Sequence, residues 1–139
     1  MPQDLLVEVQ ILPFKHKHYT MLTSMLSDQK YPGIDFVTMK SLPKIGYIAT
    51  LRNQPIAAGF LRRIEGGYGQ LDTFATNPHF GKLIRNEGLN KVVDSLINEA
   101  KELKLLGLIG FTGDLGIITR AKDQGFQIIN QTIIGLTLD

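Results

Sequence analysis

The sequence predicts one small α/β domain, in which helices flank a mixed, mostly antiparallel sheet. The length of the chain, 139 residues, suffices for one hydrophobic core but not for two. Apolar residues alternate with polar ones in several short segments, as they do in strands, and recur at helical spacing in others. The order of these segments begins with strand, helix and three strands, and continues with helix, strand, helix and terminal strands.

The first half of the chain predicts a strand, a helix and a series of three antiparallel strands. Residues 5–12 alternate in polarity, which predicts a strand closed by Pro13. Apolar residues at helical spacing predict a helix over 15–29, which the turn sequence at 31–33 ends. Turn sequences also separate the three strands that follow. These strands are predicted over 45–51, 56–64 and 70–76.

The second half predicts two helices and the strands that follow them. A long helix is predicted from Leu89 onward, because its apolar residues fall on one stripe. Residues 105–112 predict a buried strand, and 115–123 predict a short helix. A strand, a helix and a strand in succession favour a parallel pair. Residues 126–138 predict one bent or two short terminal strands.

Composition excludes several classes of function. The chain has no cysteine, which rules out disulfides, thiolate zinc sites and a cysteine nucleophile. It has no apolar run long enough for a membrane span and no signal-peptide pattern, so we expect a cytoplasmic protein. His16 and His18 have no carboxylate cluster to complete a metal site. A net charge of +2 suits an anionic ligand but does not indicate nucleic acid.

The join between the predicted strand 70–76 and the long helix carries the most chemistry. Unpaired N–H groups and the positive end of the dipole make a helix N-terminus attractive to anions. Arg85 adds a fixed cation, and Gly88 lets the backbone approach a phosphate closely. The segment therefore predicts a cradle for a pyrophosphate group. It consists of Arg85, Asn86, Glu87, Gly88, Leu89 and Asn90.

These residues resemble the GNAT superfamily of acetyl-CoA-dependent N-acetyltransferases. The signature of that family, Gln/Arg-x-x-Gly-x-Gly/Ala, lies between the fourth strand and the next helix, and Arg85 and Gly88 occupy its first two positions. Residues 76–78, Thr-Asn-Pro, are similar to the Val-x-Pro of the family, and residues 124–126, Gln-Gly-Phe, to its Leu-Gly-Phe. The order of elements is also that of the family, so the resemblance covers nearly the whole chain.

The resemblance implies an acyltransferase that moves an acetyl group from acetyl-CoA to a primary amine. Its expected partners are acetyl-CoA and an amine acceptor, and its expected state is a monomer or a homodimer. The pantetheine arm would lie where the fourth and fifth strands splay apart, bonded to the backbone of Phe74, Ala75 and Thr76. Residues 85–90 would hold the pyrophosphate. Asp114 stands where many members carry an asparagine that contacts the cofactor.

Asp72 is the candidate general base. Acetyl transfer needs an uncharged amine, a polarised thioester carbonyl and a thiolate that can leave. Alternation along the strand puts Asp72 on the same side as Phe74 and Thr76, where it would accept the amine proton through water. A backbone N–H near Thr76 would polarise the carbonyl. A hydrogen-bonded structural carboxylate is the alternative interpretation of Asp72.

Other features leave alternatives open. The third signature position is Asn90 rather than Gly or Ala, and the tyrosine that commonly protonates the thiolate is Ala121 here. Tyr47, Tyr68 or water would then take that role. Tyr31 and the first helix would line an acceptor pocket, although such spacing more often indicates a core stripe. Arg85 and Gly88 alone are also compatible with a solvated charge and a helix-start glycine.

Three functions are compatible with this pattern. They are an active N-acetyltransferase, a GNAT-like CoA-binding or regulatory module that has lost catalysis, and a related enzyme that acts on nucleic acid. All three share the same architecture. The acceptor has no short signature in this fold, so the sequence does not identify it.

Overall fold

A computed structural model of the chain describes residues 8–31, 33–111, 115–129, 132, 134–136 and 138. Within these residues, five strands form one sheet in the order β1-β2-β3-β4-β5. Neighbouring strands are antiparallel except β4 and β5, which are parallel. The strands are β1 Gln10–Pro13, β2 Ile45–Leu51, β3 Gln54–Ile64, β4 Tyr68–Thr76 and β5 Gly107–Gly110.

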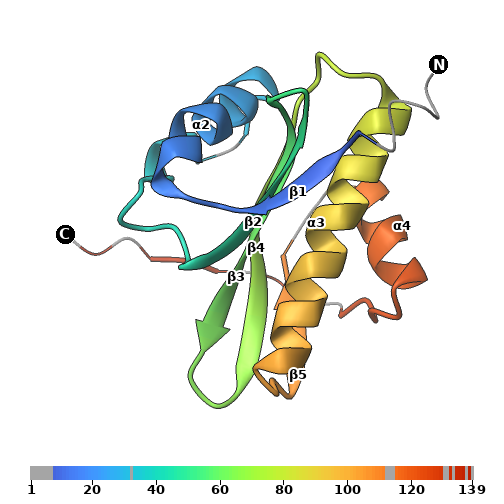
Figure 1. Ribbon diagram of the computed structural model, residues 1–139. Helices are drawn as coiled ribbons and strands as arrows, with labels where there is room; N and C mark the ends of the chain where they lie inside the picture. The colour runs from blue at the N-terminus through green and yellow to red at the C-terminus, as the bar shows by residue number, and fades with distance from the viewer. Residues whose placement is uncertain are drawn as a thin grey trace.

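Helices cover both faces of the sheet, as Figure 1 shows. Helix α2 lies on one face, and α3 lies along the other with α4 beside it. The predicted fold class, a mostly antiparallel sheet with one parallel pair and flanking helices, is therefore confirmed. The helices are α2 Tyr19–Asp28, α3 Lys82–Glu102 and α4 Leu115–Asp123, with 3-10 helices η1 His16–His18 and η2 Ile34–Phe36 on either side of α2.

β3 forms the centre of the core because both of its faces are covered. Ala57 and Leu61 belong to the hydrophobic cluster on the α3 face. Ala58 and Phe60 belong to a second cluster, on the α2 face. Successive side chains of a strand point to opposite faces, so the continuous apolar run over residues 56–61 is covered on both sides. We call these two sides the α3 face and the α2 face.

The predicted turn between β2 and β3 is confirmed. Arg52 and Asn53 have φ angles of 49° and 66°, both in the left-handed region. Two consecutive residues of this kind make the tight turn whose twist matches that of a hairpin. β2 and β3 then pair from Leu51 and Gln54 at the turn to Ile45 and Leu61.

The first strand differs from its predicted limits. β1 is Gln10–Pro13 and so includes the proline that was expected to close it, while residues 5–7 lie outside the described residues. β1 is at the edge of the sheet, where Pro13 is opposite Tyr47. Proline cannot donate a hydrogen bond to a neighbouring strand, but an edge strand tolerates it.

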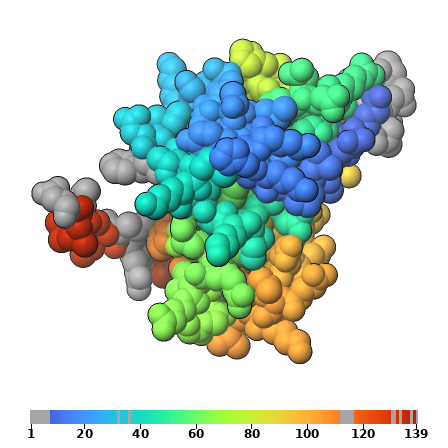
Figure 2. Space-filling model, turned by 60° about the vertical axis from the view of Figure 1, so that its left-hand side comes forward, coloured from blue at the N-terminus to red at the C-terminus, as the bar shows by residue number. Residues whose placement is uncertain are grey.

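The terminal segment also differs from its prediction. The described residues between 126 and 138 form no strand. Ile134, Leu136 and Leu138 are 90%, 84% and 82% exposed. Figure 2 shows the red end of the chain standing apart from the body of the molecule. Alternating aliphatic residues form a strand only where a neighbouring strand supplies hydrogen bonds, and none does so for these described residues.

Candidate active site

β4 contains a bulge that changes which face its side chains take. Asp72 is opposite Phe60, and Ala75 is opposite Ala58, so Thr73 and Phe74 together face one residue of β3. Thr73 has a φ of 51°, a left-handed conformation that is rare for a β-branched residue. The extra residue shifts the alternation of side chains by one position.

Asp72 therefore lies on the α2 face, and Phe74 lies on the α3 face. A Cβ atom added to Gly59 would collide with the ring of Phe74 and would come within 3.1 Å of Val92, which belongs to α3. Phe74 also packs against the hydrophobic cluster of the α3 face. The prediction that Asp72 shares a side with Phe74 and Thr76 is thus wrong, because a regular alternation was assumed across the bulge.

Beyond the bulge, no described strand pairs with β4 on the side of β5, and we call this part of β4 its open edge. The parallel pairing runs from Tyr68 and Gly107 to Leu71 and Gly110, where β5 ends. The N–H of Asn77 donates to the carbonyl of Ile56 (2.8 Å), so this peptide points toward β3. Because peptide groups alternate in direction along a strand, the carbonyl of Phe74 and the N–H of Thr76 point away from β3.

The side-chain amide of Gln29 bonds to this open edge. The N–H of Thr76 donates to Oε1 of Gln29 (2.8 Å), and Nε2 of Gln29 donates to the carbonyl oxygen of Phe74 (3.4 Å). Gln29 directly follows α2, so one helix end reaches across to the strand. Sequence analysis missed this contact, because nothing near Gln29 in the chain indicates a partner in β4.

The long helix begins earlier than the sequence predicted. α3 starts at Lys82, with Gly81 as its N-cap and no side chain capping it. The N–H of Arg85 already donates to the carbonyl of Gly81 (3.0 Å). The N–H groups without a partner inside the helix are therefore those of residues 82–84. The prediction that residues 85–90 form a loop before the helix is wrong.

Gly88 explains the error. It is buried inside α3, where a Cβ atom would come within 2.6 Å of Cγ2 of Ile56 and 3.4 Å of Cβ of Ala49. A glycine at this place in the sequence suggests a loop, but here the missing side chain allows α3 to approach the sheet closely. Leu89 is buried in the same contact.

Asn86 and Asn90 lie on the side of α3 that faces α4. Both side-chain oxygens accept hydrogen bonds from Arg120, at 3.0 Å and 3.1 Å respectively. A groove of about 430 Å³ lies along these residues, and Asp94, Asp123 and Gln124 also line it. Asn90, the residue that departs from the family signature, therefore connects the two helices. Sequence analysis did not single out Arg120.

Arg85 and Glu87 complete the predicted cradle. Both are half-buried in the first turns of α3. The Nε atom of Arg85 is buried and has no hydrogen-bond partner within the described part of the chain. Asp114 lies outside the described residues.

Asp72 lines a cavity of about 330 Å³ on the α2 face. Its Oδ2 accepts a hydrogen bond from Nε of Arg62 (2.8 Å), and its Oδ1 accepts one from the hydroxyl of Thr73 (2.7 Å). The Asp72 side chain is 19% exposed, so the cavity gives it access to solvent. Val37 and Leu42 supply apolar walls.

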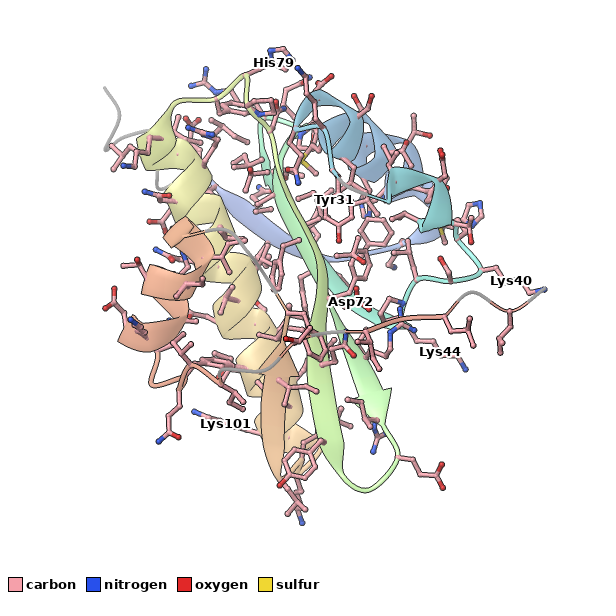
Figure 3. All side chains as sticks on the ribbon, turned by 180° about the vertical axis from the view of Figure 1, so that it is seen from behind. Tyr31, Lys40, Lys44, Asp72, His79 and Lys101 are labelled. Carbon is pink, nitrogen blue, oxygen red and sulfur yellow. The ribbon has the colours of Figure 1, made fainter. Side chains whose placement is uncertain are left out.

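Tyr31 lines the same cavity, and Figure 3 shows it on the same side of the sheet as Asp72. Burial, and then the negative charge of Asp72, raise the pKa of Tyr31, while a hydrogen bond with the Thr73 side chain acts in the opposite direction. Tyr31 also packs against the hydrophobic cluster of the α2 face, in which Leu22 and Met25 are fully buried, so the helix itself forms a core stripe and Tyr31 borders both the core and the cavity.

The other tyrosines considered for proton donation lie elsewhere. Tyr47 is on the α3 face, where its hydroxyl donates to Glu99 (2.8 Å). Burial and that hydrogen bond raise the pKa of Tyr47 to about 12, which makes it a poor acid near neutral pH. Tyr68 is 46% exposed at the start of β4, next to the turn. Neither lines the cavity of Asp72.

The described residues contain no group of three or more histidine, cysteine, aspartate or glutamate side chains that could hold a metal ion. Within the same residues, no helix combines the length and the apolar character that crossing a bilayer requires.

No protein-family model matches the sequence, and no curated protein matches it. A GNAT-family acetyltransferase of Staphylococcus aureus matches in structure, with a TM-score of 0.72 at 14% identity, over 94% of this chain and 94% of that one. A predicted acetyltransferase of Clostridium acetobutylicum with acetyl-CoA has a TM-score of 0.66 at 20% identity, over 92% of this chain and 96% of that one. An aminoglycoside N-acetyltransferase in complex with CoA has a TM-score of 0.64 at 11% identity, over 93% and 94% of the two chains.

Proposed function

We propose, on the premise that the chain has the GNAT fold, that it is an acyltransferase that moves an acetyl group from acetyl-CoA to a primary amine. The observation that carries this proposal is the open edge of β4 beside the start of α3. The edge offers the carbonyl of Phe74 and the N–H of Thr76, and the helix start offers the N–H groups of 82–84. Acetyl-CoA has an amide-bearing arm next to a pyrophosphate, so its two parts match two neighbouring surfaces.

In this proposal, the pyrophosphate binds at the first turn of α3 rather than along the whole of 85–90. The N–H groups of residues 82–84, which have no partner within the helix, and the positive end of the helix dipole lie at that turn. Arg85 lies at the end of this turn, and its fixed positive charge makes it the proposed cation. Gly88 would support the site by letting α3 lie close to the sheet.

The proposed reaction is attack of a neutral amine nitrogen on the thioester carbon, which forms the C–N bond and breaks the C–S bond. A backbone N–H on the edge of β4 near Thr76 polarises the carbonyl oxygen. Asp72 is the proposed base, and it accepts the amine proton through a water molecule from the cavity on the α2 face. The sulfur leaves as a thiolate and then takes a proton from water. An alkyl thiol with a pKa of about 8.5 is acidic enough to leave in this form.

The second candidate is a module that binds CoA without catalysis. Two observations favour it. Each carboxylate oxygen of Asp72 already accepts a hydrogen bond, from Arg62 or from Thr73. In addition, Ala121 has no hydroxyl to donate where the family commonly has a tyrosine. Cofactor binding is common to both candidates, so the two are separated by turnover.

Calorimetric titration with acetyl-CoA tests cofactor binding, and Gly81 offers a matched pair of variants. Among the described residues, no atom lies within 4 Å of a Cβ added at Gly81, and its φ of −66° suits any residue. Gly81→Glu puts a negative charge at the start of α3 and is expected to weaken binding by at least about tenfold through repulsion of the pyrophosphate. Gly81→Gln has the same shape without the charge and should bind like the wild type. Absence of wild-type binding would refute the proposal.

Release of free thiol from acetyl-CoA then separates the two candidates. The acceptor panel contains polyamines, aminoglycosides, amino acids and lysine peptides, because a primary amine is the only chemistry that the proposal specifies. Thiol release that depends on one of these amines supports the enzyme. Binding of acetyl-CoA without release in any mixture supports the module.

A further inference from the structure

Gln29 bonds to the open edge of β4 in the way that a peptide group of a neighbouring strand would. Its Oε1 accepts from the N–H of Thr76, and its Nε2 donates to the carbonyl of Phe74. These two backbone groups are the ones that the proposed function gives to the amide-bearing arm of acetyl-CoA. One primary amide therefore satisfies a donor and an acceptor that the cofactor also needs.

We propose that Gln29 is an internal stand-in for the cofactor amide: it closes the edge of β4 in the free protein and is displaced when acetyl-CoA binds. The inference rests on the proposed function, because it assigns to that site a competitor within the chain. Gln29 thereby sets the affinity for the cofactor without being part of the reaction. It also covers two backbone groups that would otherwise be open to pairing with another chain.

The side chain of Gln29 is able to leave without unfolding α2. The N–H of Gln29 donates to the carbonyl of Met25 (3.0 Å), and the N–H of Tyr31 donates to that of Leu26 (2.9 Å). These backbone bonds hold the end of the helix independently of the amide. Gln29 is half-buried, so a change of rotamer moves its amide toward solvent. Such rotamer changes are fast compared with ligand binding.

The hydrogen-bonding groups of the β4 edge restrict which ligands displace Gln29 without leaving a backbone group unpaired. A ligand must donate to Phe74 and accept from Thr76, because an unsatisfied backbone group is costly. A secondary amide does both, whereas a phosphate or an ester lacks the donor. Gln29 therefore competes with the pantetheine half of acetyl-CoA and not with the nucleotide half, which would bind at the start of α3.

Titration of two ligands tests this competition. Gln29→Ala is expected to lower the dissociation constant of acetyl-CoA by about three- to tenfold, the range that corresponds to the net value of the hydrogen bonds that no longer compete. Its affinity for 3′-phosphoadenosine 5′-diphosphate, which has the phosphates but no amide, should not change. Gln29→Asn, one methylene shorter, serves as a milder variant. Ser27→Ala, exposed on the last turn of the same helix, is the matched control and should bind both ligands like the wild type.

Hydrogen exchange of the Thr76 amide gives a second readout that does not depend on affinity. In the free wild type this amide should be protected, and in free Gln29→Ala it should exchange faster. With acetyl-CoA bound, it should be protected in both. Equal or weaker binding of acetyl-CoA by the folded Gln29 variants, or an unprotected Thr76 in the free wild type, would overturn the inference and leave the proposed function intact. No binding of acetyl-CoA by any of these proteins would instead refute the proposed function, and the inference with it.

Discussion

The two faces of the sheet differ in how they are filled, although the same strands build both. On the α3 face, a Cβ atom at Gly88 of α3 would come within 2.6 Å of Ile56 of β3, and one at Gly59 of β3 would come within 3.1 Å of Val92 of α3. On the α2 face, β4 leaves a cavity of about 330 Å³ in which Arg62 and Asp72 meet. Both faces hold a buried hydrophobic cluster, and the α2 face also contains this polar cavity.

The bulge at Thr73 determines which residues of β4 belong to each face. Before it, Asp72 is on the α2 face, and after it Phe74 is on the α3 face. If residues 72–74 alternated regularly, the ring of Phe74 would point to the same side as the carboxylate of Asp72. One strained residue in a strand is thus enough to separate a packing ring from a polar site.

The largest effect is expected on the α2 face. Asp72→Asn keeps the shape of the side chain but removes the proposed base, so kcat should fall by about a hundredfold or more, while calorimetric binding of acetyl-CoA stays unchanged. Glu99→Gln is the matched control, because Glu99 is a carboxylate on the α3 face that contacts Tyr47. It should keep full activity. Thiol release with the active amine measures both variants, and full activity of Asp72→Asn would reduce Asp72 to a structural partner of Arg62.

The next effect is expected on the α3 face, at Gly88. Replacing glycine by alanine in an exposed helix stabilises by about 1 kcal/mol. At Gly88 the new methyl group would meet Cγ2 of the buried Ile56 at 2.6 Å. We therefore expect Gly88→Ala to destabilise the protein, with a loss of about 1–3 kcal/mol in the free energy of unfolding, measured by urea denaturation. Gly81→Ala, whose Cβ meets no described atom within 4 Å, should cost less than Gly88→Ala, because only the weaker N-cap preference of alanine acts there. A more stable Gly88→Ala protein would contradict the close contact.

The sequence was most informative where apolar residues repeat with a regular period. Alternation and turn residues predicted β2, β3 and β4 with small shifts at their ends, and the short helix α4 has its predicted limits. The order of elements also predicted the parallel pair of β4 and β5. In each of these cases the local pattern and the packing of the fold favour the same structure.

The sequence was misleading where a distant contact decides the local structure. Gly88 has the local character of a loop, but its contact with Ile56 keeps it inside α3. Thr73 gives no sign in the sequence that it adopts a φ of 51°, so the change of face after Asp72 was not predictable. Gln29 lies 47 residues from Thr76, and no spacing rule connects a helix end with a strand edge at that distance. These are also the positions that shape the candidate site.

The smallest expected effect is on the pH dependence of the free energy of unfolding, to which Tyr47 on the α3 face and Tyr31 on the α2 face both contribute. Burial and the bond to Glu99 raise the pKa of Tyr47 to about 12 in the folded protein, against 10.0 for a free tyrosine. Between these values the folded chain binds more protons than the unfolded one, so the free energy of unfolding should fall as pH rises. Tyr47→Phe removes this contribution, and the fall between about pH 10 and about pH 12 should become shallower. A remaining slope is expected, because the pKa of Tyr31 on the α2 face is also raised. Urea denaturation at several alkaline pH values measures the difference, and identical slopes for Tyr47→Phe and the wild type would show that the hydroxyl of Tyr47 is not held by Glu99 in solution.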